Sequence, residues 1–176
     1  MSETIVAADL PLPKPVKPRS YACAEYKLIK LRDCPLDSGS AVDTAERVYS
    51  FWTQHIPKAQ WFRDEQETFV VFFLSTRRHM TGFNLVTIGT LDSVLVHPRE
   101  VFRLAIVASA HAIVLAHNHP SGDPTPSEAD IKVTRDLIRG GQLLKIEVLD
   151  HVIVGRPSQV KPVPFVSLRE QGYFFT

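Results

Sequence analysis

Cysteine is nearly absent from this chain, whose 176 residues include only Cys23 and Cys34. No CxxC pair is present, which excludes a cysteine zinc knuckle and argues against a structural disulfide. Free thiols are the usual state in a reducing compartment, so we expect a cytoplasmic protein. Two metalloenzyme signatures are missing as well. The chain contains neither HExxH, the zincin motif, nor PCxxC, the zinc deaminase motif.

The sequence also lacks a long apolar run and an excess of charge of one sign. The apolar stretch over residues 105–117 is interrupted by His111 and is too short for a membrane span. The start, MSETIVAADLPLPKP, has no basic segment before an apolar core, so we expect no signal peptide. The net charge is +1 and the arginines are scattered, which gives no strong nucleic-acid signal. The scattered arginines include Arg77, Arg78, Arg99, Arg103, Arg135 and Arg139.

Prolines gather at the start of the chain, at Pro11, Pro13, Pro15 and Pro18. This composition predicts that residues 1–40 form an extended, partly mobile N-terminal lead. One strand is predicted within the lead, over residues 26–31. Residues 41–66 are predicted to form a helix and a linker, and residues 67–176 the main domain.

The helix of this second segment is predicted to begin at Asp43, because Asp43 and Glu46 have the spacing of a capping box. Val48, Trp52 and Ile56 share one helical face, which favours packing against the domain. The same face could instead serve a partner. Pro57 is expected to end the helix.

The main domain alternates strand and helix signals. Strands are predicted over residues 69–74, 83–88, 112–116 and 146–154, with an edge element after residue 164. One helix is predicted from Pro98 to about Ala110, and another after residue 127. The residues predicted to be buried in the first of these helices are Val101, Phe102, Ala105 and Ile106. The expected class is α/β, with a mixed sheet flanked by helices.

The most informative segment is HNHPSGDPTPSEAD, residues 117–130, which follows the apolar strand AIVLA. On an extended chain, residues i and i+2 point to the same side, so His117 and His119 can face one ion. Imidazole nitrogens and a carboxylate oxygen are the ligands of a catalytic zinc, which keeps one position for water. We therefore predict a zinc site at the end of this strand.

The carboxylate is expected from the helix that follows. Ser127 has the features of an N-cap and Asp130 lies in the first turn, so a carboxylate from a helix start approaches the two imidazoles. Ser127 and Asp130 also have the spacing of a capping box, which alone would be structural. Asp123 is the weaker alternative ligand. Gly140 and Gly141 are expected to close this helix after about three turns.

The spacing His117-x-His119, seven residues, Ser127, two residues, Asp130 resembles the JAMM motif of the JAB/MPN+ metalloproteases. Residues 85–131 closely resemble the RadC branch of that family, with VHPRE and HNHPSGD as distinguishing phrases. The likeness extends to DHVIVG and SLREQG near the C-terminus. It implies that residues 67–176 form a RadC-like JAB/MPN metal-binding domain with a three-layer, cytidine-deaminase-like fold.

The resemblance also implies roles for residues. Glu67 matches the glutamate of the family's Glu-x-Phe phrase and would be the general base, with Glu65 as its close rival. Ser127 would donate its hydroxyl to the oxyanion of the reaction. Zn²⁺ would be bound by the two histidines and Asp130, for hydrolysis of an amide or isopeptide bond. His151, inside a strand pattern, is expected to be a core or supporting histidine rather than a fourth ligand.

Two functions remain open at this stage. The first is a zinc metallopeptidase or isopeptidase acting on a protein or peptide substrate. The second is a non-catalytic binding or regulatory module linked to DNA repair, the association that gave the RadC branch its name. The presence of every motif residue favours the enzyme. Longer RadC proteins carry a helix-hairpin-helix region, and none is recognisable in this sequence.

Overall fold

The structure, a computed structural model, describes residues 42–89, 96–159 and 162–174. The chain divides into two units, Met1–Leu31 and Arg32–Thr176, and the described residues all belong to the second. The predicted N-terminal lead and its strand over residues 26–31 lie outside the described part of the chain.

The described residues form a mixed sheet and flanking helices, which confirms the predicted α/β class. The strands are β1 (Glu67–Leu74), β2 (Met80–Gly89), β3 (Ala112–Asn118), β4 (Glu147–Val154) and β5 (Phe165–Ser167). The helices are α1 (Ala45–His55), η1 (Ile56–Lys58, 3₁₀), α2 (Pro98–Val107) and α3 (Glu128–Leu144). The strand order is β2-β1-β3-β4-β5. β3 and β4 are parallel, and the other neighbours are antiparallel.

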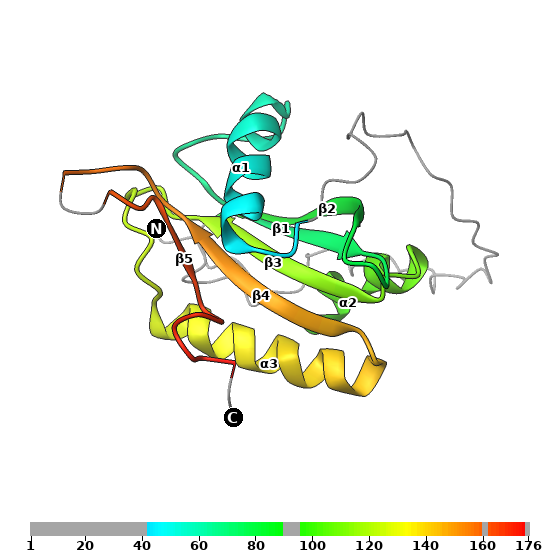
Figure 1. The fold of residues 1–176 in the computed structure, drawn as a ribbon. Coiled ribbons are helices and arrows are strands. Elements are labelled where there is room, and N and C mark those ends of the chain that lie inside the picture. The colour runs from blue at the N-terminus through cyan, green and yellow to red at the C-terminus, as the bar shows by residue number, and fades with distance from the viewer. Residues whose placement is uncertain (1–41, 90–95, 160–161, 175–176) are drawn as a thin grey trace, which may run out of the picture. The chain divides into compact units, whose positions relative to one another are not determined.

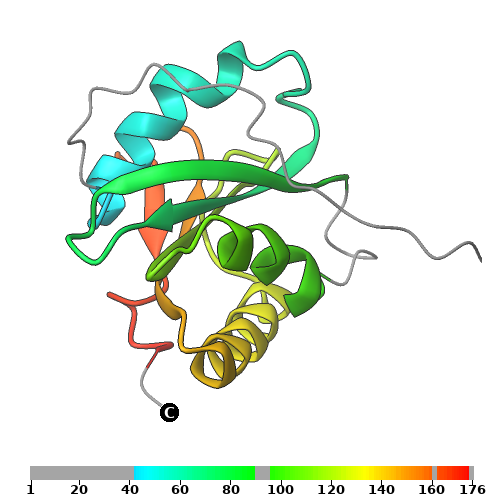
Figure 2. The same ribbon diagram turned by 90° about the vertical axis from the view of Figure 1, so that its right-hand side faces the viewer.

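Helices cover both faces of the sheet and so make three layers. Successive side chains of a strand point to opposite faces, and both faces of β1 and β3 are apolar. On β1, Val70 and Phe72 pack in one buried cluster with α1, while Phe69 and Val71 pack in another with α2 and α3. Figures 1 and 2 show α1 on one side of the sheet and α2 with α3 on the other.

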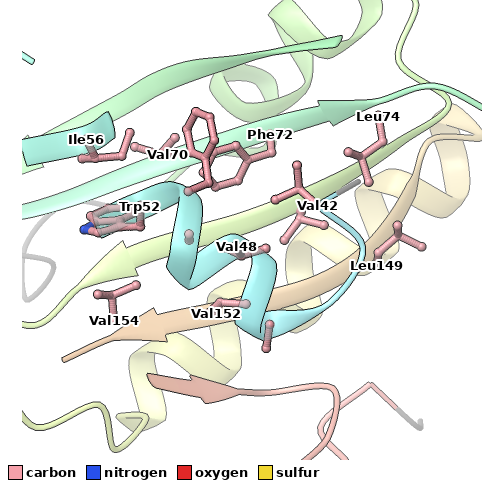
Figure 3. Close-up of a cluster of buried hydrophobic side chains, with 14 of the residues drawn as sticks. Val42, Val48, Trp52, Ile56, Val70, Phe72, Leu74, Leu149, Val152 and Val154 are labelled. Atoms are coloured by element: carbon pink, nitrogen blue, oxygen red, sulfur yellow. The ribbon is translucent and has the colours of Figure 1, made fainter. Parts of the chain in front are cut away.

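The face of α1 predicted to pack against the domain does so. Val48, Trp52 and Ile56 are at most 3% exposed and belong to the buried cluster between α1 and the sheet. Figure 3 shows them over Phe72 of β1 and Val152 of β4. Pro57 lies in η1, directly after α1 ends, as expected.

The predicted start of α1 was wrong by one residue. Thr44, not Asp43, is the N-cap, and its side chain accepts a hydrogen bond from the Arg47 N–H. Asp43 instead pairs with the Arg47 guanidinium. Both residue types cap helices well, so the sequence pattern alone does not distinguish the two positions.

Two expectations for the other helices were also wrong. Ile106 of α2 is 54% exposed, because the buried stripe of this helix runs through Val101, Phe102 and Ala105. Helix α3 continues through Gly140 and Gly141 to Leu144 and has 17 residues.

These two glycines are packing positions and not a helix end. A Cβ on Gly140 would lie 3.1 Å from the Phe102 ring, and one on Gly141 would lie 2.4 Å from the Ile146 carbonyl oxygen. The glycines let α3 approach α2 and let the chain return closely into β4. The helix ends instead at Lys145, which has a left-handed backbone with φ 57°.

Candidate metal centre

Three elements converge at the end of β3. Strand β1 pairs antiparallel with β3, with Phe69 opposite His117, so the first residue of β1 lies beside the last residues of β3. The loop after β3 leads into the N-terminus of α3. Glu67, His117, His119 and Asp130 therefore come together, and one ligand atom from each lies within 4.8 Å of the others. We call these residues the metal cluster.

The spacing of the atoms in the metal cluster fits one zinc ion. Tetrahedral ligands at about 2.0–2.1 Å from zinc are roughly 3.3–3.4 Å apart. The Nε2 atoms of His117 and His119 are 3.1 Å apart. Asp130 lies 3.2 Å from His117 Nε2 through Oδ1 and 3.5 Å from His119 Nε2 through Oδ2. Two imidazoles and a carboxylate are also the donor set that suits zinc.

Glu67 stands at the side of this triangle. Its Oε1 lies 3.5 Å from His117 Nε2 and 3.9 Å from His119 Nε2. Its side chain is 13% exposed, so water can reach the carboxylate. The rival residue, Glu65, is exposed and is not part of the cluster.

Asn118, between the two histidines, fixes the backbone on both sides of Glu67. Its side chain accepts a hydrogen bond from the Thr68 N–H at 3.0 Å and donates one to the Gln66 carbonyl at 3.1 Å. Asn118 is 6% exposed and belongs to the strand opposite β1. The sequence predicts that this side chain points away from the metal as a turn or supporting residue. It does not predict these partners, because they lie about 50 residues away.

Ser127 and Asp130 form the capping box predicted from their spacing, and Asp130 still belongs to the metal cluster. Oδ2 of Asp130 accepts hydrogen bonds from the Ser127 N–H at 2.7 Å and from its hydroxyl at 2.6 Å. The Asp130 N–H donates to Ser127 Oγ. The structural and ligand interpretations are thus compatible, because the box holds one oxygen and turns the other towards His117.

The loop between β3 and α3 holds His119 through its backbone. Nδ1 of His119 lies 2.7 Å from the Asp123 carbonyl oxygen, which can only accept, so this nitrogen donates and Nε2 is left for the cluster. The Asp123 carboxylate accepts hydrogen bonds from Thr125 instead and is not in the cluster. Gly122 has a left-handed backbone, with φ +83°. A Cβ on Gly155 would lie 2.4 Å from the Gly122 carbonyl oxygen, so glycine at both positions permits the close approach of these two segments.

Electrostatics favour a cation in the metal cluster. Burial raises the pKa of Asp130, but hydrogen bonds with His117 and His119 outweigh it, and the pKa lies far below the usual range. For His119, burial lowers the pKa, while Asp130, the Asp123 carbonyl and Glu67 raise it to a net value above 6.5. The Asp130 carboxylate therefore remains charged and attracts a proton or a metal ion to the imidazoles.

A groove of about 300 Å³ opens beside His119. Its lining includes three aromatic side chains, those of Tyr49, Trp52 and Phe62. Arg156 and Asp64 also line the groove and pair with each other at 3.2 Å. The groove adjoins the metal cluster through Asn118 and His119.

The fold and the cluster together define a class: an α/β domain in which a His-x-His pair and an Asp that could hold a metal ion meet at the end of a central strand. A family model described as "RadC-like JAB domain" matches residues 42–173. The chain therefore belongs to the RadC-like JAB domain family, as its sequence motifs predict. The matched region includes α1.

Curated relatives carry the same likeness. The chain is similar to the "UPF0758 protein" of Desulfitobacterium hafniense, with 53% identity over 108 residues, 61% of this chain and 45% of the relative. It is 55% identical to that of Moorella thermoacetica over 108 residues, 61% and 44% of the two chains. It is 40% identical to that of Methanosarcina mazei over 122 residues, 69% and 50% of the two chains. The chain spans about half the length of these relatives.

Among the described residues, no helix has the length and apolar character needed to cross a membrane.

Proposed function

We propose that this domain is a zinc-dependent hydrolase that cleaves an amide bond in a protein or peptide, as a metallopeptidase or isopeptidase. The observation that carries the proposal is the metal cluster, in which Glu67, His117, His119 and Asp130 bring ligand atoms within 4.8 Å of one another. A binding module needs no acid poised beside a three-ligand site, so the position of Glu67 favours the enzyme.

His117, His119 and Asp130 would hold the ion. A bound zinc ion lowers the pKa of water to about 7 and polarises a carbonyl group. Glu67, 3.5 Å from His117 Nε2, would accept a proton from the attacking water and would return it to the departing amine. Asn118 keeps Glu67 at this place through the flanking backbone.

Ser127 would have two roles, one towards the Asp130 carboxylate and one towards the oxyanion of the reaction. Its hydroxyl donates to Asp130 Oδ2 at 2.6 Å, so it orients the ligand carboxylate. Donation to an oxyanion requires the hydroxyl to turn away, while the Ser127 N–H continues to hold Oδ2. The groove beside His119 supports a peptide substrate, since its aromatic lining can receive an apolar side chain next to the bond that is cleaved.

Metal content and cleavage test the proposal together. We expect about one zinc per chain in the wild type and in Glu67→Gln, and little in Asp130→Ala, by mass spectrometry of the purified proteins. A peptide-library screen should give cleavage by the wild type alone. Zinc binding without cleavage would favour the regulatory module linked to DNA repair, and no zinc binding after add-back would overturn both the site and the hydrolase.

A further inference from the structure

A buried chain of hydrogen bonds leads away from the metal cluster through His117. Its Nδ1 atom, on the far side of the ring from the cluster, lies 2.8 Å from His151 Nε2. His151 Nδ1 lies 2.6 Å from the Thr134 hydroxyl oxygen. That hydroxyl lies 2.6 Å from the main-chain carbonyl of Asp130. His117, His151 and Thr134 are each 0% exposed.

The Asp130 carbonyl, at the end of this series of hydrogen bonds, fixes the direction of each hydrogen bond in the series. A carbonyl oxygen only accepts, so Thr134 donates its single hydroxyl proton to Asp130 and must accept from His151 Nδ1–H. A neutral His151 then has a lone pair on Nε2, which accepts from His117 Nδ1–H. In a neutral His117 ring, Nε2 is then the nitrogen without a proton, and this atom faces Asp130 and His119.

The surroundings of His151 favour the neutral ring that this argument needs. Its two hydrogen-bond partners are a hydroxyl and another imidazole, and neither carries a negative charge. The Phe69 ring lies 5.3 Å from the His151 ring and stacks on His117 at 5.9 Å, which keeps apolar surface around the pair.

The sheet register brings His151 to His117. A bulge between β3 and β4 pairs Ile113 with Val148 but Val114 with Asp150, so one residue of β4 is passed over. Beyond the bulge, Leu115 lies opposite His151, and neighbours in register point to the same face. His151 therefore faces the side of His117 and α3. Without the bulge, it would face α1.

We infer that His151 and Thr134 are positioning residues that hold His117 in the Nδ1–H tautomer and so present its Nε2 lone pair to the metal. The role in metal binding rests on the proposed zinc site, whereas the tautomer is a property of the metal-free protein. His119 obtains the same orientation directly from the Asp123 carbonyl. His117 obtains it through two side chains, which substitution can remove.

The tautomer can be measured directly. Long-range ¹H–¹⁵N NMR of the metal-free wild type, in mildly alkaline buffer, distinguishes protonated from unprotonated ring nitrogens. We expect His117 and His151 both to carry the proton on Nδ1. A proton on Nε2 of His117 would overturn the inference without any variant having to fold.

Substitution at Thr134 tests the cause. In Thr134→Val, His151 Nδ1 loses its acceptor, so both rings should move their protons to Nε2. Thr134→Ser retains the hydroxyl and should retain the wild-type tautomers. Thr53→Val is the matched control, since Thr53 makes the same hydroxyl bond to the carbonyl four residues earlier in α1. Unchanged tautomers in Thr134→Val would refute the inference.

Zinc affinity, measured by competition with a chelator, gives the second readout. Partners of metal ligands typically change affinity by about 10–100-fold. We expect a loss of about tenfold in Thr134→Val, since zinc must first displace the proton from His117 Nε2, and no loss in Thr134→Ser or Thr53→Val. If the wild type shows the expected tautomers but binds no zinc, the proposed function is rejected, while the inference about the His117 tautomer stands. If all variants bind zinc equally well, Thr134 and His151 have no role in zinc binding.

Discussion

The histidines of the metal cluster differ in how their rings are held. Main chain fixes His119, because its Nδ1–H donates to the Asp123 carbonyl. Side chains fix His117, through His151 and Thr134. A hydrogen-bonded partner on the second ring nitrogen both orients a ligand and makes it more basic. The two ligands should therefore respond differently to substitution nearby.

The contribution of His119 to the stability of the metal-free protein should fall as the pH rises above about 6.5. The folded-state pKa of His119 is raised, because Asp130 and Glu67 outweigh the effect of burial. A raised histidine pKa stabilises the fold below the unfolded value of 6.5, and this contribution is lost as the pH rises through the folded value. Urea unfolding of chelator-treated protein at several pH values checks this.

The control for the pH prediction is His119→Gln, in which this loss should disappear because the titrating ring is gone. Zinc-loaded protein should show the opposite trend, since protons compete with the ion for His119. A stability difference between the metal-free wild type and His119→Gln that is constant or grows over this range would contradict the prediction.

Local sequence determines part of the site and distant pairing determines the rest. His117, His119 and Asp130 lie within fourteen residues, so strand and helix geometry is enough to predict that they meet. Glu67 comes from another strand, and only the family resemblance selects it. The Thr134 and His151 contacts depend on a bulge in β4, which no local pattern marks. The sequence predicts a supporting role for His151 but not its partners.

At the scale of elements, α3 carries both a ligand and tight packing. The double glycine in its last turns resembles a helix stop, since glycine is common just after helices. Here the cause is close packing: Gly141 lies against the Ile146 carbonyl, directly after the helix, and Gly140 lies against the Phe102 ring of α2. Sequence periodicity predicts that the helix exists but not where it ends. The close contacts that leave no room for a side chain at these glycines are seen only in the folded structure.

Gly141→Ala should destabilise the protein although alanine favours helices by about 1 kcal/mol. Its Cβ would lie 2.4 Å from a backbone oxygen, and overpacking of this kind costs about 1–3 kcal/mol or more. Gly140→Ala is the matched control. Its Cβ would meet a side-chain atom, in the Phe102 ring, at the longer distance of 3.1 Å. Urea unfolding should rank Gly141→Ala below Gly140→Ala, and equal stabilities would contradict the packing explanation.

At the scale of the whole domain, the core does not depend on the metal cluster. Two large buried clusters, one on each face of the sheet, join α1, α2 and α3 to the strands. The cluster residues come from β1, the end of β3 and the first turn of α3. The metal-free chain should therefore fold, with zinc as an added connection between elements.

Zinc should raise the melting temperature by mass action. An ion that binds only the folded state adds about 2.7 kcal/mol at 100 times its Kd. Calorimetry with and without a chelator should show this shift in the wild type and in Glu67→Gln, and none in Asp130→Ala. An equal shift in Asp130→Ala would mean that the ion binds elsewhere.

Asp130 joins the site at both of its ends. Its carboxylate belongs to the metal cluster, while its main-chain carbonyl accepts from Thr134. Only the carboxylate depends on the side chain, so a lineage that exchanged this aspartate for another residue could retain the hydrogen bonds of Thr134 and His151. Threonine and histidine at these two positions in a homologue therefore testify to an inherited scaffold. They do not show that the homologue could hold a metal ion at this place, which in the proposed site also requires the carboxylate of the aspartate.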